Sequence, residues 1–531
     1  MKSSIVRVLL ASALAAGLTL SAQAQAQTLR WASQGDAQTM DPHSQNESLT
    51  NQINGQVYEA LVDRDRQLNL GPRLALSWQQ TGPLAWRFKL RPNVKFHDGS
   101  PFTADDVVFT LQRAKEPTSQ LNVYANALGT ATAVDPLTVD FKLERVNPVF
   151  LQHLSTIPVM SRAWSEKNKV TRPLDFKNRE ESFASFNANG TGAFILVQRQ
   201  PGIKTTFKRN PAWWGKFEGN VQEIVYTPIA NDATRLAALV SGEIDFVLDP
   251  APRDIARLRN TSGVKIIEGP ENRVVFLGMD QARDKLLYAK VPGDKNPFKD
   301  RRVRLALYQA IDIEAIRTRL LNGQSAPTGG NTPSPAGAYN DPTIESRFPF
   351  DLARARALMA EAGYPDGFEI TLDCPNNRYI NDEEICIALA SMWAQLKVKV
   401  RVNAMPRTTY FPKLEKLDTS LFMYGWGGAI TDAETSMTPL MRIRGDKGVG
   451  QYNYGNVRNE KFDALAAQSS IEADPAKREQ LVRAALREWR EQVHTIPLHR
   501  QVIPWAARSN VTAVHRADNW LEVPWVTVAP K

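Results

Sequence analysis

The sequence predicts an α/β protein with more than one domain. Strand and helix patterns alternate over residues 223–267 and again over residues 368–402, as they do where crossover helices join the strands of a sheet. Residues 75–145 differ, because apolar and polar residues there alternate with the period of antiparallel hairpins. A chain of 531 residues is also long enough for two or more domains.

The N-terminus predicts export. Lys2 and Arg7 flank the start of an apolar run at residues 8–20, and two overlapping Ala-x-Ala cleavage sites follow at residues 22–26. The run is too short to span a bilayer, so we interpret residues 1–26 as a cleaved signal peptide. No later apolar run reaches the length of a membrane span, so we expect a protein of the periplasm in a cell with two membranes.

Composition argues against several other classes of protein. Hydrophobic residues make up 43% of the chain, and the basic residues behind its net charge of +9 are scattered, so we expect no nucleic-acid partner. The six histidines show no ligand spacing with one another or with the two cysteines, so we expect no metal site and no cofactor. No nucleophile elbow, zinc-protease motif or Walker loop is present, and we predict no enzyme. A glycosidase that uses two of the many acids stays an alternative.

The two cysteines, Cys374 and Cys386, lie at the end of an expected strand and in the helix that follows it. An oxidising compartment would permit a disulfide that fastens the connecting loop to the helix. Sequence alone does not give the distance between them, so both the bonded and the free state stay open.

The elements of the first part follow from local patterns. Trp86, Phe88 and Leu90 alternate with polar residues, which places one face of a strand in a core. Thr103 and Asp106 form a capping box at the start of a helix. The expected elements in order are a strand at 29–32, a helix at 45–61, strands at 74–78, 85–90 and 94–96, a helix at 103–113, a hairpin at 131–143, and strands at 190–194 and 204–210.

From residue 223 the pattern changes to alternating strands and helices, interrupted by a Pro/Gly-rich connection at 326–342. The expected strands are 223–228, 244–248, 264–267, 274–279, 368–372 and 399–402, with a strand-like return at 496–508. The expected helices are 232–241, 253–258, 301–310, 352–362, 383–396, 460–468 and 475–492.

One stretch, residues 422–434, combines features of a binding site. An apolar strand end runs into a glycine-rich turn that carries Trp426, and Asp432 follows. A Trp ring is a flat apolar wall, Gly425 and Gly427 let a backbone come close to a partner, and an acid can neutralise a cation that lies on the ring. The alternative is a structural turn with a buried Trp and a helix N-cap at Thr431 or Asp432.

An ordered set of short motifs over nearly the whole chain resembles a known family. The set is similar to the peptide/nickel group, family 5, of the extracytoplasmic solute-binding proteins of ABC importers. The matching motifs are Leu29-Arg30-Trp31-Ala32, Met40-Asp41-Pro42, Tyr58-Glu59-Ala60-Leu61-Val62, the stretches at 86–99 and 102–107, Gly190-Thr191-Gly192-Ala193-Phe194, residues 209–215, Ser241-Gly242-Glu243-Ile244-Asp245, residues 301–306 and residues 361–367.

The resemblance implies a two-lobed fold of the type II periplasmic-binding-protein kind. Lobe I would comprise residues 27–274 and 500–531, with an extra β-rich subdomain at about 50–185, and lobe II residues 275–499. The chain would cross between the lobes near 274–279 and 497–505. Ligand would lie between the lobes, and closure around it would present a surface to the permease.

The resemblance also suggests ligand contacts. In peptide-binding members a Trp-Gly turn followed by an Asp receives the α-amino group of the ligand, and Tyr424, Gly425, Trp426, Gly427 and Asp432 are similar to that motif. The residues Ala429-Ile430-Thr431 make the spacing looser than is usual in dipeptide binders. Asp432 is therefore expected either to meet a ligand amine or to cap the next helix.

Three further residues are candidates. Arg378 lies in a loop where such binders can place an Arg against a ligand carboxylate, a task that suits its bidentate geometry; the alternative is a surface Arg before a helix. Ser33 and Gly35 follow the first strand and would lie near the cleft.

The resemblance implies the substrate-binding component of an ABC importer, working as a monomer with the transmembrane permease subunits as partners. We expect its ligand to be a short peptide or a peptide-like zwitterion. An opine, glutathione, an oligosaccharide or a nickel chelate stays an alternative within the family, and a secreted receptor or chaperone-like module without transport is an alternative outside it.

Overall fold

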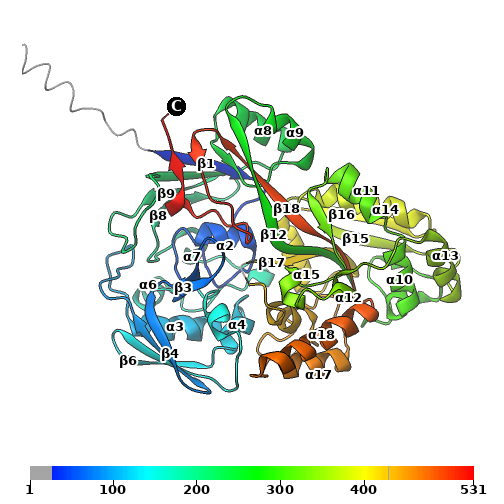
Figure 1. Ribbon diagram of the computed structural model, residues 1–531, viewed down its shortest axis with the longest axis horizontal. Coiled ribbons are helices and arrows are strands. Elements are labelled where there is room, and N and C mark those ends of the chain that lie inside the picture. Colours follow the sequence, from blue (N-terminus) through cyan, green and yellow to red (C-terminus); the bar gives the residue numbers. More distant parts are fainter. Residues whose placement is uncertain (1–26, 429, 531) are drawn as a thin grey trace, which may run out of the picture.

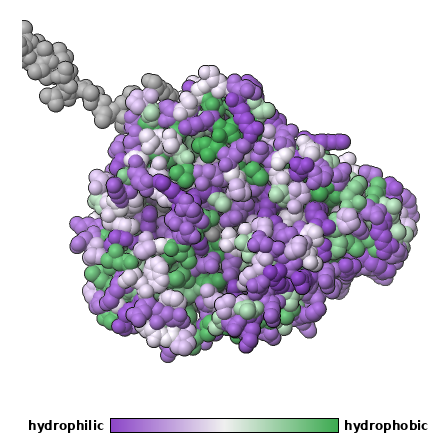
Figure 2. Space-filling view, in the orientation of Figure 1, coloured by the Kyte–Doolittle hydropathy of each residue, from purple (hydrophilic) through white to green (hydrophobic). Residues whose placement is uncertain are grey.

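The computed structural model describes residues 27–428 and 430–530 of the chain. The predicted signal peptide at 1–26 lies outside the described residues, and so does Ala429 of the Trp426 turn. Among the helices that are described, none is long and apolar enough to cross a membrane. The face shown in Figure 2 is largely hydrophilic, with scattered apolar patches.

A sheet of 12 strands runs through the molecule. Ten of them have the order β13-β15-β17-β12-β18-β11-β1-β10-β9-β8, and the other two lie off this path, where β14 pairs with β18 and β16 with β15. Its central pair is β12 (Val264–Met279) and β18 (Thr495–Arg508), which are antiparallel to each other. The register between them shifts between Pro270 and Val274. In Figure 1 this pair runs between β1, α2, β8 and β9 on the left and α10, α13 and α14 on the right. We refer to the elements before β12, with the residues after β18, as the first lobe, and to the elements between β12 and β18 as the second lobe.

The first lobe is built on a mixed part of the sheet. β1 is parallel to both β10 and β11, whereas β9 and β8 extend the sheet in antiparallel fashion. Trp31 of β1 is fully buried against Tyr226 of β10, with 4.5 Å between ring centroids. The elements are β1 (Thr28–Ser33), α2 (Ser48–Asn54), β2 (Val62–Arg64), β3 (Leu70–Pro72), β8 (Phe194–Gln200), β9 (Lys204–Arg209), β10 (Glu223–Pro228), α8 (Asp232–Ser241), β11 (Phe246–Val247) and α9 (Ile255–Arg259).

The first lobe carries a subdomain with its own sheet and its own core. The four strands have the order β4-β5-β7-β6, and buried apolar residues between 61 and 159 form a separate cluster. Trp86 stacks on Phe150 at 5.1 Å, and the predicted capping box of Thr103 and Asp106 begins α3. The elements are β4 (Ala75–Gly82), β5 (Ala85–Leu90), α3 (Ala104–Ala114), α4 (Asn122–Asn126), β6 (Thr130–Asp135), β7 (Thr138–Lys142), α5 (Phe150–Leu154), α6 (Arg162–Lys167) and α7 (Phe183–Phe186).

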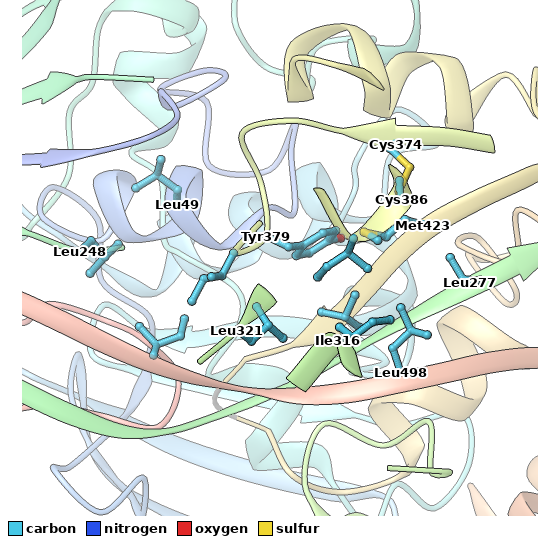
Figure 3. Packing of buried hydrophobic residues seen from close by; sticks show 14 of the residues in the cluster. Leu49, Leu248, Leu277, Ile316, Leu321, Cys374, Tyr379, Cys386, Met423 and Leu498 are labelled. Atoms are coloured by element: carbon cyan, nitrogen blue, oxygen red, sulfur yellow. A yellow bond between two sulfur atoms is a disulfide. The ribbon is translucent and has the colours of Figure 1, made fainter. Parts of the chain in front are cut away.

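The second lobe packs helices on its part of the sheet. Cys374 in β15 and Cys386 in α14 are joined by a disulfide, which lies among buried residues near Tyr379 and Met423 (Figure 3). The elements are β13 (Ala289–Lys290), α10 (Arg301–Gln309), α11 (Ile313–Ala315), β14 (Ser325–Pro327), α12 (Pro342–Glu345), α13 (Leu352–Glu361), β15 (Glu369–Pro375), α14 (Asp382–Ala394), β16 (Lys399–Met405), α15 (Arg407–Glu415), β17 (Leu421–Gly427), α16 (Glu434–Ser436), α17 (Glu460–Ser469) and α18 (Pro475–Glu491). The short strands β19 (Val511–Thr512) and β20 (Thr527–Val528) pair in the tail of the first lobe.

The predicted two-lobed α/β architecture with its additional β-rich subdomain is confirmed, and several elements differ in extent. The helix expected at 45–61 is only α2, because the chain turns at Gly55, where a Cβ would overlap the ring of Trp520. The strand expected at 94–96 is a single bridge between Lys95 and Pro101. The exact lobe boundaries stay a prediction, since 274/275 and 499/500 fall inside β12 and β18, which serve both lobes.

Candidate functional site

A cavity of about 230 Å³ lies between the two lobes. The first lobe lines it with one face of α2, with residues around Glu59 and Arg73, and with the tail around Trp520. The second lobe lines it with Arg378, Tyr379, Phe411 and the end of β17. A ligand in this cavity would touch both lobes at once.

The wall contributed by β17 is aromatic. Tyr424 and Trp426 are two positions apart on the strand, so both side chains point to the same face, and their ring centroids lie 6.4 Å apart. Trp426 also packs on Tyr452 at 5.0 Å, and its Nε1 donates to the carbonyl oxygen of Thr435 at 2.9 Å. Its N–H is thereby occupied, and Trp426 offers a ligand its ring.

Two glycines allow β17 to approach its neighbours closely. A Cβ on Gly425 would lie 2.6 Å from the ring of Tyr379, and a Cβ on Gly427 would lie 2.5 Å from the carbonyl oxygen of Asn272. Both glycines line the cavity beside Trp426. Any side chain here would push apart the strand and the loop that form this wall.

Arg378 reaches the cavity from the loop between β15 and α14. The Asp382 carboxylate fixes this loop by accepting from the backbone N–H groups of Arg378 and Tyr379, both at 2.9 Å, and burial raises the pKa of Asp382 to about 7. The Nε atom of Arg378 lies 2.9 Å from Oε1 of Glu47. Within the described part of the chain, no hydrogen bond is made by its two Nη atoms, which leaves that edge of the guanidinium for a ligand.

Glu47 connects the two lobes. It precedes α2 in the first lobe, where its carboxylate caps the helix by accepting from Thr50 N at 3.0 Å. The same carboxylate lies 3.0 Å from Nη1 of Arg407 in the second lobe, and both side chains are only 2% exposed. Burial favours the neutral acid, but the charges of Arg407 and Arg378 outweigh it and lower the pKa of Glu47 to about 2. This carboxylate is therefore ionised between two arginines at neutral pH.

The positively charged part of the cleft has more arginines than acids. Nε of Arg273 donates to Glu271 at 2.8 Å, and Arg273 also lines the cavity. We call this group the basic end; its members are Arg273, Arg378, Arg407, Glu47 and Glu271. Of these, Arg273, Arg378 and Glu47 line the cavity itself, and two arginines against one acid leave one positive charge there for a ligand anion to match.

Ser33 and Gly35 lie beside the basic end rather than in the cavity of about 230 Å³ between the lobes. Ser33 Oγ donates to Asp249 at 2.8 Å and lines a small neighbouring cavity of about 30 Å³, which Arg378 and Arg407 also line. Gly35 faces Arg407 across the lobes so closely that a Cβ would overlap the guanidinium group. Gly35 thus determines how closely the lobes approach each other at this point. It is not among the described residues that line the cavity between the lobes.

Asp432 has protein partners in this structure. Its two carboxylate oxygens accept from the Nη atoms of Arg478 at 2.7 and 2.9 Å, and Oδ1 also accepts from Glu434 N at 2.9 Å. It is not among the described residues that line the cavity. Asp432 thus forms an ion pair with Arg478 and accepts one backbone hydrogen bond at the start of α16, whose N-cap residue is Ala433. Both expected roles of Asp432, as an amine partner and as a helix cap, stay predictions.

A second charged group lines the cavity away from β17, and sequence reasoning missed it. Glu59 accepts from Arg73 at 2.8 Å, and Arg516 donates to Asp518 at 2.5 Å and to Glu522 at 2.9 Å. We call this group the acidic end; its members are Glu59, Asp63, Asp518, Glu522, Arg64, Arg73 and Arg516. It holds four acids against three arginines.

Signals for the missed residues were present in the sequence. In the tail, Arg516, Asp518, Trp520 and Glu522 stand at every second position, the spacing of side chains on one side of an extended segment. Such a pattern in a chain terminus favours a contact surface over a solvated tail. In the structure the segment turns at 516–519, where Asn519 N donates to the carbonyl oxygen of Arg516 at 3.0 Å. Glu47 also precedes a polar helix, although nothing local pairs it with Arg378 or Arg407.

No group of three or more His, Cys, Asp or Glu residues that could hold a metal ion is found in the described part of the chain. The charged groups of the cavity instead suit hydrogen bonds and ion pairs with an organic solute.

Comparison with known proteins gives a family match over most of the chain. The sequence model described as "Bacterial extracellular solute-binding proteins, family 5 Middle" matches residues 69–447. The chain is 26% identical over 484 residues to heme-binding protein A of Haemophilus influenzae, which covers 85% of this chain and 83% of that protein. It is likewise 26% identical over 484 residues to the glutathione-binding protein GsiB of Escherichia coli O157:H7, covering 89% and 88%.

The fold is shared with solved structures. The periplasmic binding protein DppA of Helicobacter pylori, in complex with the peptide STSA, superposes with a TM-score of 0.82 at 20% identity, over 94% of this chain and 98% of that one. At this level of identity the likeness establishes the two-lobed architecture.

Proposed function

Because the chain belongs to the bacterial extracellular solute-binding proteins of family 5, we propose that it captures a short peptide or a peptide-like zwitterion for an ABC importer. The lobes close around the solute, and the closed form is recognised by the transmembrane permease subunits. Closure is driven by contacts that the ligand makes with both lobes only in the closed state. The protein does this as a monomer, with no chemical change to the solute.

One observation carries the proposal. The cavity between the lobes places an aromatic wall, Tyr424 and Trp426, beside the basic end, where the Nη edge of Arg378 has no hydrogen bond within the described residues. A guanidinium edge suits a carboxylate, and aromatic faces suit the apolar part of a peptide. Gly425 and Gly427 contribute by keeping that wall close to Tyr379 and Asn272.

The names of the relatives support a small organic solute. GsiB is a glutathione-binding protein, and the DppA structure holds a four-residue peptide. Both ligands carry carboxylates that the basic end could hold. The predicted signal peptide at 1–26 would place the mature protein in the periplasm, where such solutes are captured.

The proposal is tested with the mature protein and a panel of solutes. Thermal shift is measured with alanine peptides, glutathione, an opine, an oligosaccharide and a nickel–histidine chelate, and calorimetry follows each positive. We expect the alanine peptides to raise the melting temperature. A shift with the oligosaccharide or the nickel chelate alone would overturn the peptide assignment and select that alternative.

The transport role needs a separate test. A strain that lacks this protein but retains the permease should lose uptake of the labelled peptide, and restoring the chain with its signal peptide should restore it. Unchanged uptake, together with tight binding in vitro, would instead support a receptor without transport.

A further inference from the structure

We propose that the acidic end of the cavity binds the amino group of the ligand, and that the ligand is a zwitterion of tripeptide length with its carboxylate at the basic end. This assignment rests on the proposed function and deepens it. It places the amine about 10 Å from the carboxylate, at the opposite end of α2 from Arg378, and gives Asp432 no part in amine binding.

Helix α2 separates the two ends. Ser48, Asn51 and Asn54 are spaced three apart and all line the cavity, so one face of the helix runs along its length. A seven-residue helix with a rise of 1.5 Å per residue is about 10 Å long. Glu47 of the basic end lies just before its first residue, while Gly55 follows its last residue and contacts the ring of Trp520.

The tail segment places the acidic end beyond the last turn of α2. Gln52 Nε2 donates to the carbonyl oxygen of Asn519 at 2.6 Å, and Gln56 Nε2 donates to that of Leu521 at 3.3 Å. The side chains of Asp518 and Glu522, on either side of this contact, then line the same cavity as Arg378. The two charged groups thus lie at opposite ends of one helix.

The charges of the acidic end fit a cation. Its four acids face three arginines, so one negative charge is left over once Glu522 is ionised, whereas the basic end has one positive charge left over. Asp63 is the most exposed of these acids, at 37% of its side chain, and its nearest base is Arg73 Nε at 3.5 Å. Its Oδ1 accepts from the backbone N–H of Arg64 at 2.8 Å. Oε1 of Glu522 accepts from Arg516 alone among the described residues.

A buried acceptor at this end also lacks a partner. Asn54 is 2% exposed and lines the cavity, and its Oδ1 has no hydrogen bond within the described residues. A buried unpaired acceptor is costly, and an ammonium group with three donors would satisfy it. This atom points to a donor on the ligand independently of the charge count.

The electrostatics of Glu522 suit a cation beside its carboxyl group. Burial raises the pKa of Glu522 to about 7, in spite of Arg516 and Arg73, and the nearby charges of Asp63 and Asp518 add to the rise. Burial also lowers the pKa of Arg64 to about 10. A ligand ammonium beside Glu522 would favour its ionised form.

The distance between the ends sets the length of the ligand. An extended chain spans at most about 3.3–3.6 Å per residue, so three residues cover about 10 Å. A dipeptide is too short to place its amine and its carboxylate at both ends of α2, and longer peptides would have to bulge. Among unbranched peptides, the tripeptide therefore fits best.

The experiment measures affinities by calorimetry on the full mature chain. Dialanine to pentaalanine give the length dependence, and N-acetyl-trialanine and trialanine amide report on the two termini. The variants are Glu522→Gln and Asp63→Asn at the acidic end, Asp432→Asn for the competing assignment, and Asp366→Asn as a control whose side chain is 85% exposed and pairs with Lys397. Melting temperatures without ligand show whether each variant is folded.

We expect trialanine to bind most tightly of the series and to be preferred over its N-acetyl form. In Glu522→Gln and Asp63→Asn that preference should fall by about tenfold or more, the effect of one charge-assisted bond, while binding of N-acetyl-trialanine changes little. Asp366→Asn should behave as the wild type. If Glu522→Gln fails to fold, the result for Asp63→Asn alone tests whether the acidic end binds the amine.

Other outcomes separate the two proposals. If trialanine binds and the amine preference is lost in Asp432→Asn but kept in the acidic-end variants, the assignment is overturned and the proposed function stands. If dialanine binds more tightly than trialanine, the proposed tripeptide length of the ligand is wrong. If no peptide binds to the wild type, the proposed ligand class fails and this assignment fails with it.

Discussion

Replacing Gly35 by alanine tests whether the close approach of the lobes at Arg407 is needed for binding. Gly35 belongs to the first lobe and Arg407 to the second, and a Cβ at position 35 would overlap the guanidinium group. That group has little freedom to move, because its Nε donates to the carbonyl oxygen of Asn377 at 3.0 Å and its Nη1 lies 3.0 Å from Glu47. The added methyl group must therefore displace Arg407 or hold the lobes apart.

The size of the effect follows from what Arg407 loses. Its side chain is 2% exposed, so water cannot replace Glu47 as a partner, and separating a buried charge pair costs about 3–5 kcal/mol. Taking the lower figure, because the backbone can relax in part, about 3 kcal/mol corresponds to roughly a hundredfold loss of affinity. The cost arises only when the lobes are closed, so the unliganded protein should melt as the wild type does.

The assay is titration calorimetry with trialanine, combined with thermal unfolding in the absence of ligand. Gly82→Ala is the matched control, because its Cβ would meet only the Cβ of Ala85 at 3.9 Å, an ordinary contact. An affinity for Gly35→Ala equal to that of the wild type would refute the reasoning, since it would mean that Arg407 finds room without losing Glu47. A large fall in melting temperature without ligand would instead place Gly35 in folding rather than in closure.

Three further predictions follow from the site and the core. Arg378→Gln should weaken binding of trialanine by about ten- to a hundredfold and of trialanine amide much less, since only the free carboxylate loses a charge-assisted bond; equal losses would exclude the carboxylate role. The pKa of Glu522 is about 7 without ligand, and a ligand ammonium would lower it, so binding of trialanine should release protons near pH 7 and weaken as the pH falls below 7. Calorimetry in buffers of different ionisation enthalpy measures this release, and its absence would contradict the prediction. The groups that face this carboxyl are Arg516, Asp518, Asp63 and Arg73. Replacing both Cys374 and Cys386 by serine should lower the free energy of unfolding by about 3 kcal/mol, the usual effect of losing a disulfide that closes a loop of this length. Urea titration measures this, and an unchanged urea midpoint would show that α14 is held by packing alone.

Local patterns predicted most of the fold. The alternation of apolar and polar residues predicted the strands of the subdomain, and apolar residues at helical spacing predicted the crossover helices. Both patterns are local, because the period of two in a strand and of 3.6 in a helix follows from the geometry of the element itself. Helix α15 was not predicted, because it contains Pro412, and a proline in a sequence is normally taken to end a helix. β12 was expected as two strands because Gly269 and Pro270 interrupt the apolar pattern, yet the pairing with β18 carries it through a shift of register.

The site was predictable only where its residues are local. Tyr424, Gly425, Trp426 and Gly427 form one continuous signal, and the structure brings all four to the cavity. The pairing of Glu47 with Arg407 joins residues 360 positions apart, and the sequence around one of them does not indicate the other as its partner. Contacts of this kind depend on the path of the whole chain, which a single sequence does not display.

The long strand β18 has a consequence for how the protein comes to be folded. β11 of the first lobe pairs with β18, with Phe246 opposite Ala507, and Trp520 packs on Gly55 near the start of the chain. The first lobe therefore lacks a neighbouring strand and part of its core until the last residues have been synthesised. Closing such long loops slows folding, because their entropy is lost before the contacts form. A chain that completes its first lobe last stays extended for longer, a delay that would suit the export that the predicted signal peptide at 1–26 implies.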